Sequence, residues 1–423
     1  MQDQNLMYYK NLLIKNLGKF FIAILFSTVI SYIIYKQLVY PTIIPMISND
    51  LVHIFADWSV IFNASVCKNG NVDVYLKIMC DPWGRPHVYG KLLLFFPFVK
   101  SLNNFYYLIL PIIINFFLIY TVVSFFDEQN FKKKLYLPIF LFSFPVLLAI
   151  ERANVDILLF LIMVIISKYK NLFLTHLLII ISFMSKFYPI VFGVVFFINS
   201  KFKNILVNLS VLLIIYSLFI FIEFDDLVKI FKNSHLFSAA GIYEFSIKGF
   251  IQYSQGLNIR FGNINLNLFK FFFILIPIVL TFSVFLKKVI NNQDISNIFL
   301  LNTFENRLYV ISSATMIACY FVFSNFPYRE IFFLGLIPWI LKSIKRDNNF
   351  FMNFYFNVLS FKFLASTIVT YLVQNKILLS FKPLLVYLKY IIDFYLIIIV
   401  FLILLIGFIK FISKNKQKII IYK

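Results

Sequence analysis

The side chains best suited to chemistry gather at a few points of an otherwise apolar chain. The densest group is Glu151-Arg152-Ala153-Asn154-Val155-Asp156, with four polar side chains in six residues between two apolar stretches. Charges in such a setting are costly unless they pair or function. Asn154 and Asp156 are suited to cap a following helix, and Arg152 with that helix N-terminus is suited to bind a phosphate. A pairing of Glu151 with Arg152 alone is the structural alternative.

Two later turns each combine a cation with a tyrosine. Snorkelling to a membrane interface is the plainer interpretation of an isolated lysine. Three cations predicted at the same face, one of them from the motif above, instead favour a shared anionic ligand. The residues of the two turns are Lys186 and Tyr188, which precede and follow Phe187, and Tyr328 and Arg329, which follow Pro327.

Two earlier stretches add a carboxylate and several aromatic rings. Asp57 precedes Trp58, and a carboxylate partly desolvated by aromatic neighbours is suited to accept a proton from a hydroxyl. A helix cap or a solvated loop position is the alternative for Asp57. The irregular stretch from 80 to 90 contains Trp83 and Arg85, which together with Trp58 and His235 are suited to line a cleft for a polar ligand. A turn that only clamps the loop is the alternative there.

The elements that must position these residues are predicted to be membrane helices. Apolar residues make up 61% of the 423 positions, charged residues only 13%, and the mean hydropathy is +0.88. Soluble domains carry about 25% charged residues. We therefore expect an all-α, polytopic bundle of about 10–13 helices in one domain over residues 1–423. The expected spans are residues 20–35, 105–126, 135–150, 156–167, 172–185, 189–199, 205–222, 268–286, 308–324, 330–341, 351–373 and 384–409.

The distribution of basic residues predicts the orientation of this bundle. A net charge of +21 can indicate nucleic-acid binding, but the lysines lie in short clusters between apolar runs, which favours topology over nucleic acid. We expect both termini in the cytoplasm, with a basic tail at 410–423. Long exterior loops then cover 36–104 and 223–267, and every polar group described above lies on the exterior side.

The exterior loops carry two further predictions. Cys67 and Cys80 share the first loop, so an oxidising compartment favours a disulfide between them, whereas the third cysteine, Cys319, lies in a span. No metal site is predicted, because the spacing of potential ligands matches no metal motif. In the second loop, Leu227, Ile230 and Phe231 have the spacing of an amphipathic helix lying in the membrane interface, and an ordinary packed loop is the alternative.

Two of these motifs together resemble a known family. E-R-A-N-V-D at 151–156, followed by S-K-F-Y-P at 185–189, is similar to the pattern of glycosyltransferase family 87. These are bacterial polyprenyl-phosphate-dependent mannosyltransferase-like membrane proteins of the C-type glycosyltransferase superfamily. The D-W pair at 57–58 and the Y-R pair at 328–329 also resemble it. The family usually has glycine at the position of Ala153, so the chain departs from the pattern there.

The resemblance implies an enzyme of the bacterial inner membrane with its active site on the exterior face. It would transfer a mannose-like hexose from a polyprenyl-phosphate donor to a lipid or glycan acceptor, without a cofactor, with Asp57 as general base. His235 is an alternative base. A transporter or flippase of lipid-linked saccharides is a second hypothesis. We expect the spans to be nearly free of charge, with Lys362 the main exception, which argues against transport. A polymerase or ligase of surface polysaccharide is a third hypothesis.

Overall fold

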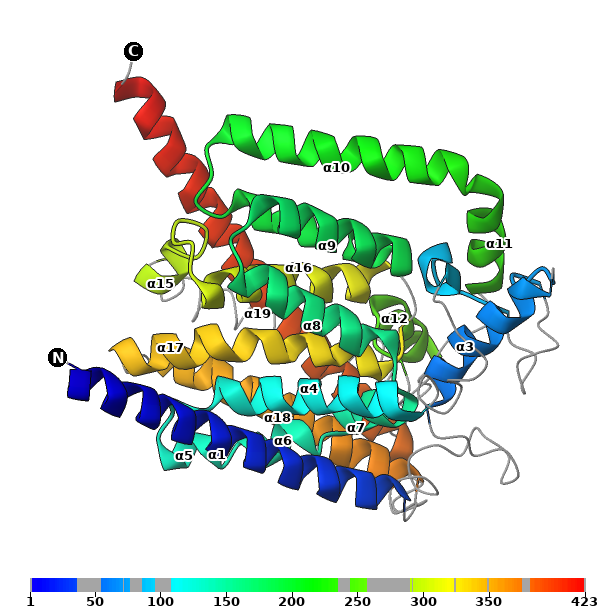
Figure 1. Ribbon diagram of the computed structural model, residues 1–423, viewed down its shortest axis with the longest axis horizontal. Coiled ribbons are helices and arrows are strands. Elements are labelled where there is room, and N and C mark those ends of the chain that lie inside the picture. Colours follow the sequence, from blue (N-terminus) through cyan, green and yellow to red (C-terminus); the bar gives the residue numbers. More distant parts are fainter. Residues whose placement is uncertain are drawn as a thin grey trace, which may run out of the picture.

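The computed structural model describes most of the chain, and the described residues form helices and turns with no strand among them. The helices lie side by side in one bundle, with both termini towards one end and α3, α11 and α12 towards the other (Figure 1). We call the latter the α3 end. The described residues are 2–35, 55–70, 72–76, 86–95, 108–234, 244–256, 290, 292–322, 325–347, 350–374 and 381–421.

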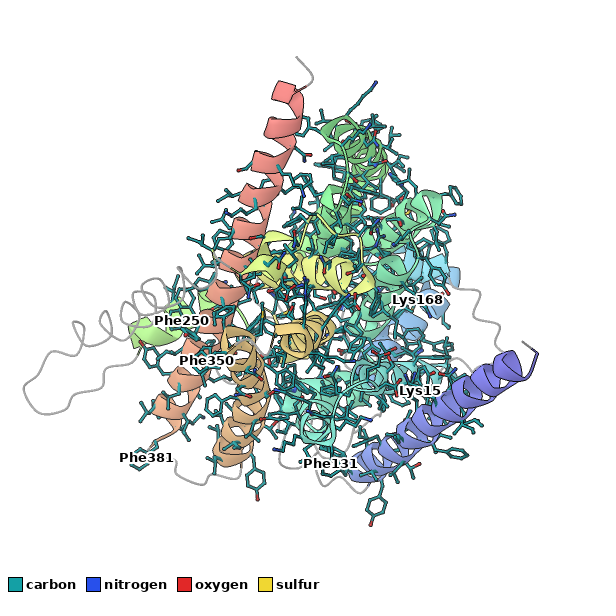
Figure 2. All side chains as sticks on the ribbon, turned by 90° about the vertical axis from the view of Figure 1, so that its left-hand side faces the viewer. Lys15, Phe131, Lys168, Phe250, Phe350 and Phe381 are labelled. Atoms are coloured by element: carbon teal, nitrogen blue, oxygen red, sulfur yellow. The ribbon has the colours of Figure 1, made fainter. Side chains whose placement is uncertain are left out.

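Several helices are long and apolar enough to cross a membrane, as the sequence predicts. Among the described residues four helices meet this condition, and a fifth span is formed if two helices that meet at 52°, Phe131–Leu141 and Phe144–Arg152, are taken together. Figure 2 shows α1 at the edge of the bundle, and most of its described side chains are exposed. These helices indicate a membrane protein. The four are α1 (Gln2–Tyr35), α10 (Phe202–Ile222), α18 (Phe350–Gln374) and α19 (Lys382–Ile421).

Shorter helices fill the bundle between these spans. The centre is α16 (Phe304–Val322), which packs against α8, α19 and two 3₁₀ helices, η4 (Tyr188–Phe197) and η8 (Pro327–Leu336). Short helices are tolerated at membrane depth where protein covers their ends. The others are α4 (Leu110–Phe125), α5 (Phe131–Lys134), α6 (Leu137–Leu141), α7 (Phe144–Arg152), α8 (Val155–Lys168), α9 (Leu172–Ser185), α15 (Gln293–Ser296) and α17 (Ile337–Asp347).

Most expected spans coincide with a helix of the structure. The range 172–185 is reproduced by α9, and 351–373 agrees with α18 within one residue at each end. The ranges 189–199 and 330–341 overlap the two 3₁₀ helices, each of which begins at or beside a proline. The expected span 268–286 lies outside the described residues.

At the α3 end, parts of the two long predicted loops pack together. The first contributes α3 (Ala56–Asn69) and η1 (Lys91–Phe95), and the second contributes α11 (Phe224–Ser234), whereas α12 (Ile247–Gly256) packs against α19. The expected amphipathic helix is α11, and Ile230 on its apolar face is buried against the first loop. The small core that they share consists of Ala64, Cys67, Val74, Tyr75, Leu94 and Ile230.

Candidate active site

The E-R-A-N-V-D motif forms the break between α7 and α8. Helix α7 ends at Arg152, and Ala153 adopts a left-handed backbone conformation with φ 45° and ψ 49°. Asn154 then caps α8, because its side-chain oxygen accepts a hydrogen bond from the backbone N–H of Asp156 at 2.9 Å. The capping role expected for Asn154 is therefore confirmed. The reversal at Ala153 brings the side chains on either side of it to the same end of the two helices.

Asp57 lies directly on this break. Helix α3 begins after Phe55, whose backbone N–H donates to the carbonyl oxygen of Glu151 at 2.9 Å. The Asp57 carboxylate accepts from the Arg152 guanidinium at 3.1 Å and from the Asn154 amide at 2.6 Å. Arg152 therefore forms its ion pair with a residue 95 positions earlier in the chain.

Asp156 is the second carboxylate of the site and has three partners. The Lys186 ammonium pairs with it, and the Tyr188 hydroxyl donates to it at 2.7 Å. The Arg329 Nε lies 3.5 Å from its other oxygen. Lys186 also donates to the Asn154 side-chain oxygen at 3.3 Å, so it connects the two carboxylates through one amide. The Asp57–Asp156 cluster, as we name it, consists of Asp57, Arg152, Asn154, Asp156, Lys186, Tyr188 and Arg329.

Tyrosine rings surround the cations of this cluster. The Lys186 ammonium lies 5.1 Å from the ring centre of Tyr89 and 5.9 Å from that of Tyr328. The Arg329 guanidinium lies 5.1 Å from the ring centre of Tyr188. Aromatic faces stabilise cations at these distances. Burial lowers the pKa of Lys186, and the negative charge of Asp156 opposes that shift.

Access to the cluster is uneven. The side chains of Arg152 and Arg329 are 16% and 20% exposed, whereas that of Asp156 is fully buried. Among the charged side chains of the cluster, those of Arg152 and Arg329 are thus the most exposed. A planar guanidinium binds phosphate or carboxylate oxygens in a bidentate manner. The arrangement is suited to hold an anion beside the carboxylate of Asp57.

A close backbone contact positions the first loop against the cluster. Gly90 donates to the Ser185 carbonyl oxygen at 2.8 Å, and a Cβ at this position would lie 1.9 Å from the Met184 carbonyl oxygen. Tyr89, next to it, is one of the aromatic residues of the stretch from 80 to 90 that the sequence singles out. Only a glycine lets this segment approach the end of α9 closely enough to bring Tyr89 over Lys186.

His87 and two ion pairs hold the surrounding loop segments together. The His87 ring is buried, with its centre 5.7 Å from that of Tyr75 and 5.6 Å from that of Tyr89. Burial lowers the pKa of His87 to about 3, so the ring is neutral near pH 7. On the surface, Lys91 pairs with Glu223 at 2.7 Å, and Lys229 of α11 pairs with Asp73 at 2.8 Å.

The structure places the remaining predicted site residues in several ways. Tyr328 joins the aromatic surroundings of Lys186, and Glu151 is buried next to the cluster. Trp58 is only 3% exposed and packs in the hydrophobic core instead of lining a cleft. Cys67 is disulfide-bonded and Cys319 is free and buried. The residues that lie outside the described part of the chain are Cys80, Trp83, Arg85 and His235.

A second buried charge cluster corrects the expectation that Lys362 is the main charge inside a span. The Lys362 ammonium pairs with Glu330 of η8 at 2.6 Å and with Asp393 of α19. Lys389, one turn before Asp393, pairs with it at 3.2 Å and lies 3.7 Å from Glu330. We call Glu330, Lys362, Lys389 and Asp393 the Glu330 quartet. Lys389 and Asp393 both lie within the expected span 384–409, so their spacing of four residues was the signal that the sequence offered.

Within the described residues no group of three or more histidine, cysteine or acidic side chains is arranged to hold a metal ion. Comparisons with protein-family models, curated proteins and solved structures find no match to this chain. The Asp57–Asp156 cluster and the motif resemblance are therefore the features that indicate a function.

Proposed function

We propose that this chain is a membrane glycosyltransferase of the C-type architecture. It transfers a mannose-like hexose from a polyprenyl-phosphate donor to a lipid or glycan acceptor. The observation that carries the proposal is the convergence of Arg152, Lys186 and Arg329 around two carboxylates at one end of a bundle of apolar helices. A lipid-linked donor needs cations for its phosphate, a carboxylate for the acceptor hydroxyl and apolar helices beside its prenyl chain.

The donor phosphate is assigned to Arg152 and Arg329, whose side chains are partly exposed. Arg152 and Arg329 flank the N-terminus of α8, where the helix dipole adds further attraction for an anion. A phosphate bound to Arg152 would compete with its ion pair to Asp57. Donor binding would thereby free an oxygen of Asp57 to accept a proton.

Asp57 is assigned as the general base. It takes the proton of the acceptor hydroxyl while the acceptor oxygen forms a bond to the anomeric carbon of the hexose. The bond from that carbon to the phosphate oxygen breaks, and polyprenyl phosphate leaves with its electron pair. Displacement by one activated hydroxyl needs one base, whereas retaining glycosidases need a second carboxylate as nucleophile.

The proposed orientation places the α3 end on the exterior side of the bacterial inner membrane. Both termini lie away from that end (Figure 1), as does the C-terminal end of α17, whose last turn contains Lys345 and Arg346. Basic segments are retained on the cytoplasmic side of a membrane. The disulfide-bonded Cys67 lies at the α3 end, as expected for an oxidising compartment.

Transfer of labelled mannose from polyprenyl-phosphate mannose to a lipid extract tests the proposal. We expect the Asp57→Asn variant to lose activity by about 10²–10⁴-fold, the usual contribution of a general base. Asp73→Asn is the matched control, because Asp73 is a carboxylate of the same loop whose partner is Lys229. Full activity of Asp57→Asn would exclude Asp57 as base. No transfer by the wild type from any polyprenyl-phosphate hexose would contradict the reaction class.

Transport of a lipid-linked saccharide is the second candidate, and one observation favours it. The Glu330 quartet places charges inside α18 and α19, and intramembrane charges often mark a transport pathway. A transporter would move polyprenyl-phosphate mannose across sealed vesicles without forming a new glycosidic bond. Polymerases and ligases would require a diphosphate-linked glycan in place of the monophosphate donor.

A further inference from the structure

The Glu330 quartet is a closed arrangement of alternating charges. Each lysine pairs with both carboxylates, and the four N–O contacts join η8, α18 and α19. All four side chains are 1% exposed or less. Helices α18 and α19 run side by side in Figure 2, so the quartet lies between two of the helices long enough to span a membrane.

Burying such a quartet between helices costs free energy. Removing four charges from water carries a large desolvation cost, and apolar side chains of similar volume often stabilise a buried site as well or better. Here the acids and bases are equal in number and face each other, so the quartet has no excess charge to offer a ligand. Its charges hold the backbone segments that carry them at fixed positions.

One of those segments, η8, leads directly to the Asp57–Asp156 cluster. Glu330 is the neighbour of Arg329, so the same turn of η8 sends one side chain to the quartet and the next to Asp156. Because the two residues share a peptide bond, fixing the Glu330 side chain limits where the Arg329 guanidinium can lie.

The second link runs to the loop that precedes α12. Lys389 donates to the backbone carbonyl oxygen of Glu244 at 3.0 Å. The next residue, Phe245, donates its backbone N–H to the Asn325 carbonyl oxygen at 2.7 Å, just before η8 begins. The quartet thus holds this loop and η8 in register with each other.

We propose that the Glu330 quartet is a positioning element for anion binding, with Glu330 setting the place of Arg329 and Lys389 setting the loop at Glu244. This inference rests on the proposed function, since it assigns Arg329 to the donor phosphate. The quartet itself touches no substrate. Its loss weakens phosphate binding through Arg329 alone.

A double-mutant cycle on phosphate binding tests this. The balanced variant Glu330→Gln with Lys389→Gln removes one acid and one base and leaves Lys362 paired with Asp393. Dissociation constants are measured for a fluorescent polyprenyl monophosphate with the purified, detergent-solubilised full chain. The control is Glu305→Gln with Lys342→Gln, which removes an exposed ion pair of 2.8 Å elsewhere.

We expect the balanced variant to bind the probe about tenfold more weakly, and the control variant to bind it like the wild type. In a chain already carrying Arg329→Gln, the same balanced change should weaken binding by less than about twofold, because its effect passes through Arg329. Equal weakening in both backgrounds would indicate a general structural effect and overturn the inference. Unchanged binding by the balanced variant would overturn it as well.

Two further outcomes are separated by the same measurements. If the balanced variant does not fold, Glu330→Asp keeps the charge, shortens its reach, and should show the same dependence on Arg329. If the wild type does not bind the monophosphate, the proposed function and the inference both fail. Binding by the wild type without coupling between the two positions overturns the inference and leaves the proposed function standing.

Discussion

The two buried charge clusters of this chain lie on either side of one short segment, η8, and they are sealed to different degrees. In the Glu330 quartet every charged side chain is 1% exposed or less, and each faces two opposite charges. In the Asp57–Asp156 cluster, two guanidinium groups keep a sixth to a fifth of their side-chain surface. All the charges of the first cluster are sealed from solvent, whereas the arginine side chains of the second remain partly exposed.

The balance of charges in the two clusters differs in the same sense. In the Asp57–Asp156 cluster three cations, Arg152, Lys186 and Arg329, face two carboxylates, so the cations outnumber the acids of the cluster. In the quartet two lysines face two carboxylates, and the charges cancel. A site that must bind and release an anion benefits from cations that keep their charge. A joint between helices benefits from charges that cancel.

The largest expected effect breaks the quartet. Lys362→Met leaves Glu330 and Asp393 with Lys389 alone, and an unpaired buried charge costs about 3–5 kcal/mol of the free energy of unfolding. Chemical denaturation of the purified protein in detergent measures this loss. Lys342→Met is the control, because that lysine is about half exposed and its pair with Glu305 contributes about 1 kcal/mol or less. Equal losses from the two variants would show that the quartet is not desolvated.

The next effect is a pH dependence of stability. It arises from His87, in the loop around the Asp57–Asp156 cluster, and not from the quartet. The pKa of His87 is lowered from 6.5 to about 3, so the unfolded chain binds a proton between these values and the folded chain does not. Stability therefore falls as the pH drops below 6.5, by about 2 kcal/mol at pH 5 relative to pH 8. Unfolding free energies measured at both pH values check this.

His87→Phe is the control for that pH effect. Phenylalanine keeps an aromatic ring between Tyr75 and Tyr89 but has no titrating group. The difference in unfolding free energy between pH 5 and pH 8 should shrink by about 2 kcal/mol in this variant. An unchanged difference would mean that other groups cause the acid sensitivity.

A third change sharpens the comparison, since it should affect binding more than folding. Arg329→Gln removes a partly exposed cation, while Asp156 keeps Lys186 and Tyr188. We expect polyprenyl monophosphate to bind about tenfold more weakly, which is about 1.4 kcal/mol, with a smaller change in the free energy of unfolding. Arg346→Gln is the control, an exposed arginine paired with Asp294 away from the cluster. A larger loss of stability than of affinity would place Arg329 with the structural charges.

The contrast also explains which parts could be predicted from the sequence. The Asp57–Asp156 cluster draws Arg152, Asn154 and Asp156 from one local motif, and a helix break between apolar runs is readable from residue types. The quartet draws its members from three separate segments. Within one of them, Lys389 and Asp393 are four residues apart in an apolar run, and that spacing alone does not reveal their partners. Pairings between distant segments depend on packing, which local patterns do not specify. For the same reason, the sequence predicts spans where η4 and η8 lie but does not predict that these segments are 3₁₀ helices.

The smallest expected effect concerns the backbone that carries the Asp57–Asp156 cluster. Ala153 has φ 45°, where an L-residue with a Cβ is strained and glycine is not. The glycosyltransferase family whose motif this segment resembles usually has glycine at this position.

Ala153→Gly should therefore stabilise the chain by about 0.5–1 kcal/mol, since the relief of strain exceeds the added entropy of the unfolded chain. Ala149→Gly, in the interior of the same helix α7, should destabilise it by about 1 kcal/mol or more. Opposite signs for two identical substitutions four residues apart would locate the strain at the break itself. A loss of stability at both positions would mean that the methyl group of Ala153 contributes more through packing than it costs in strain.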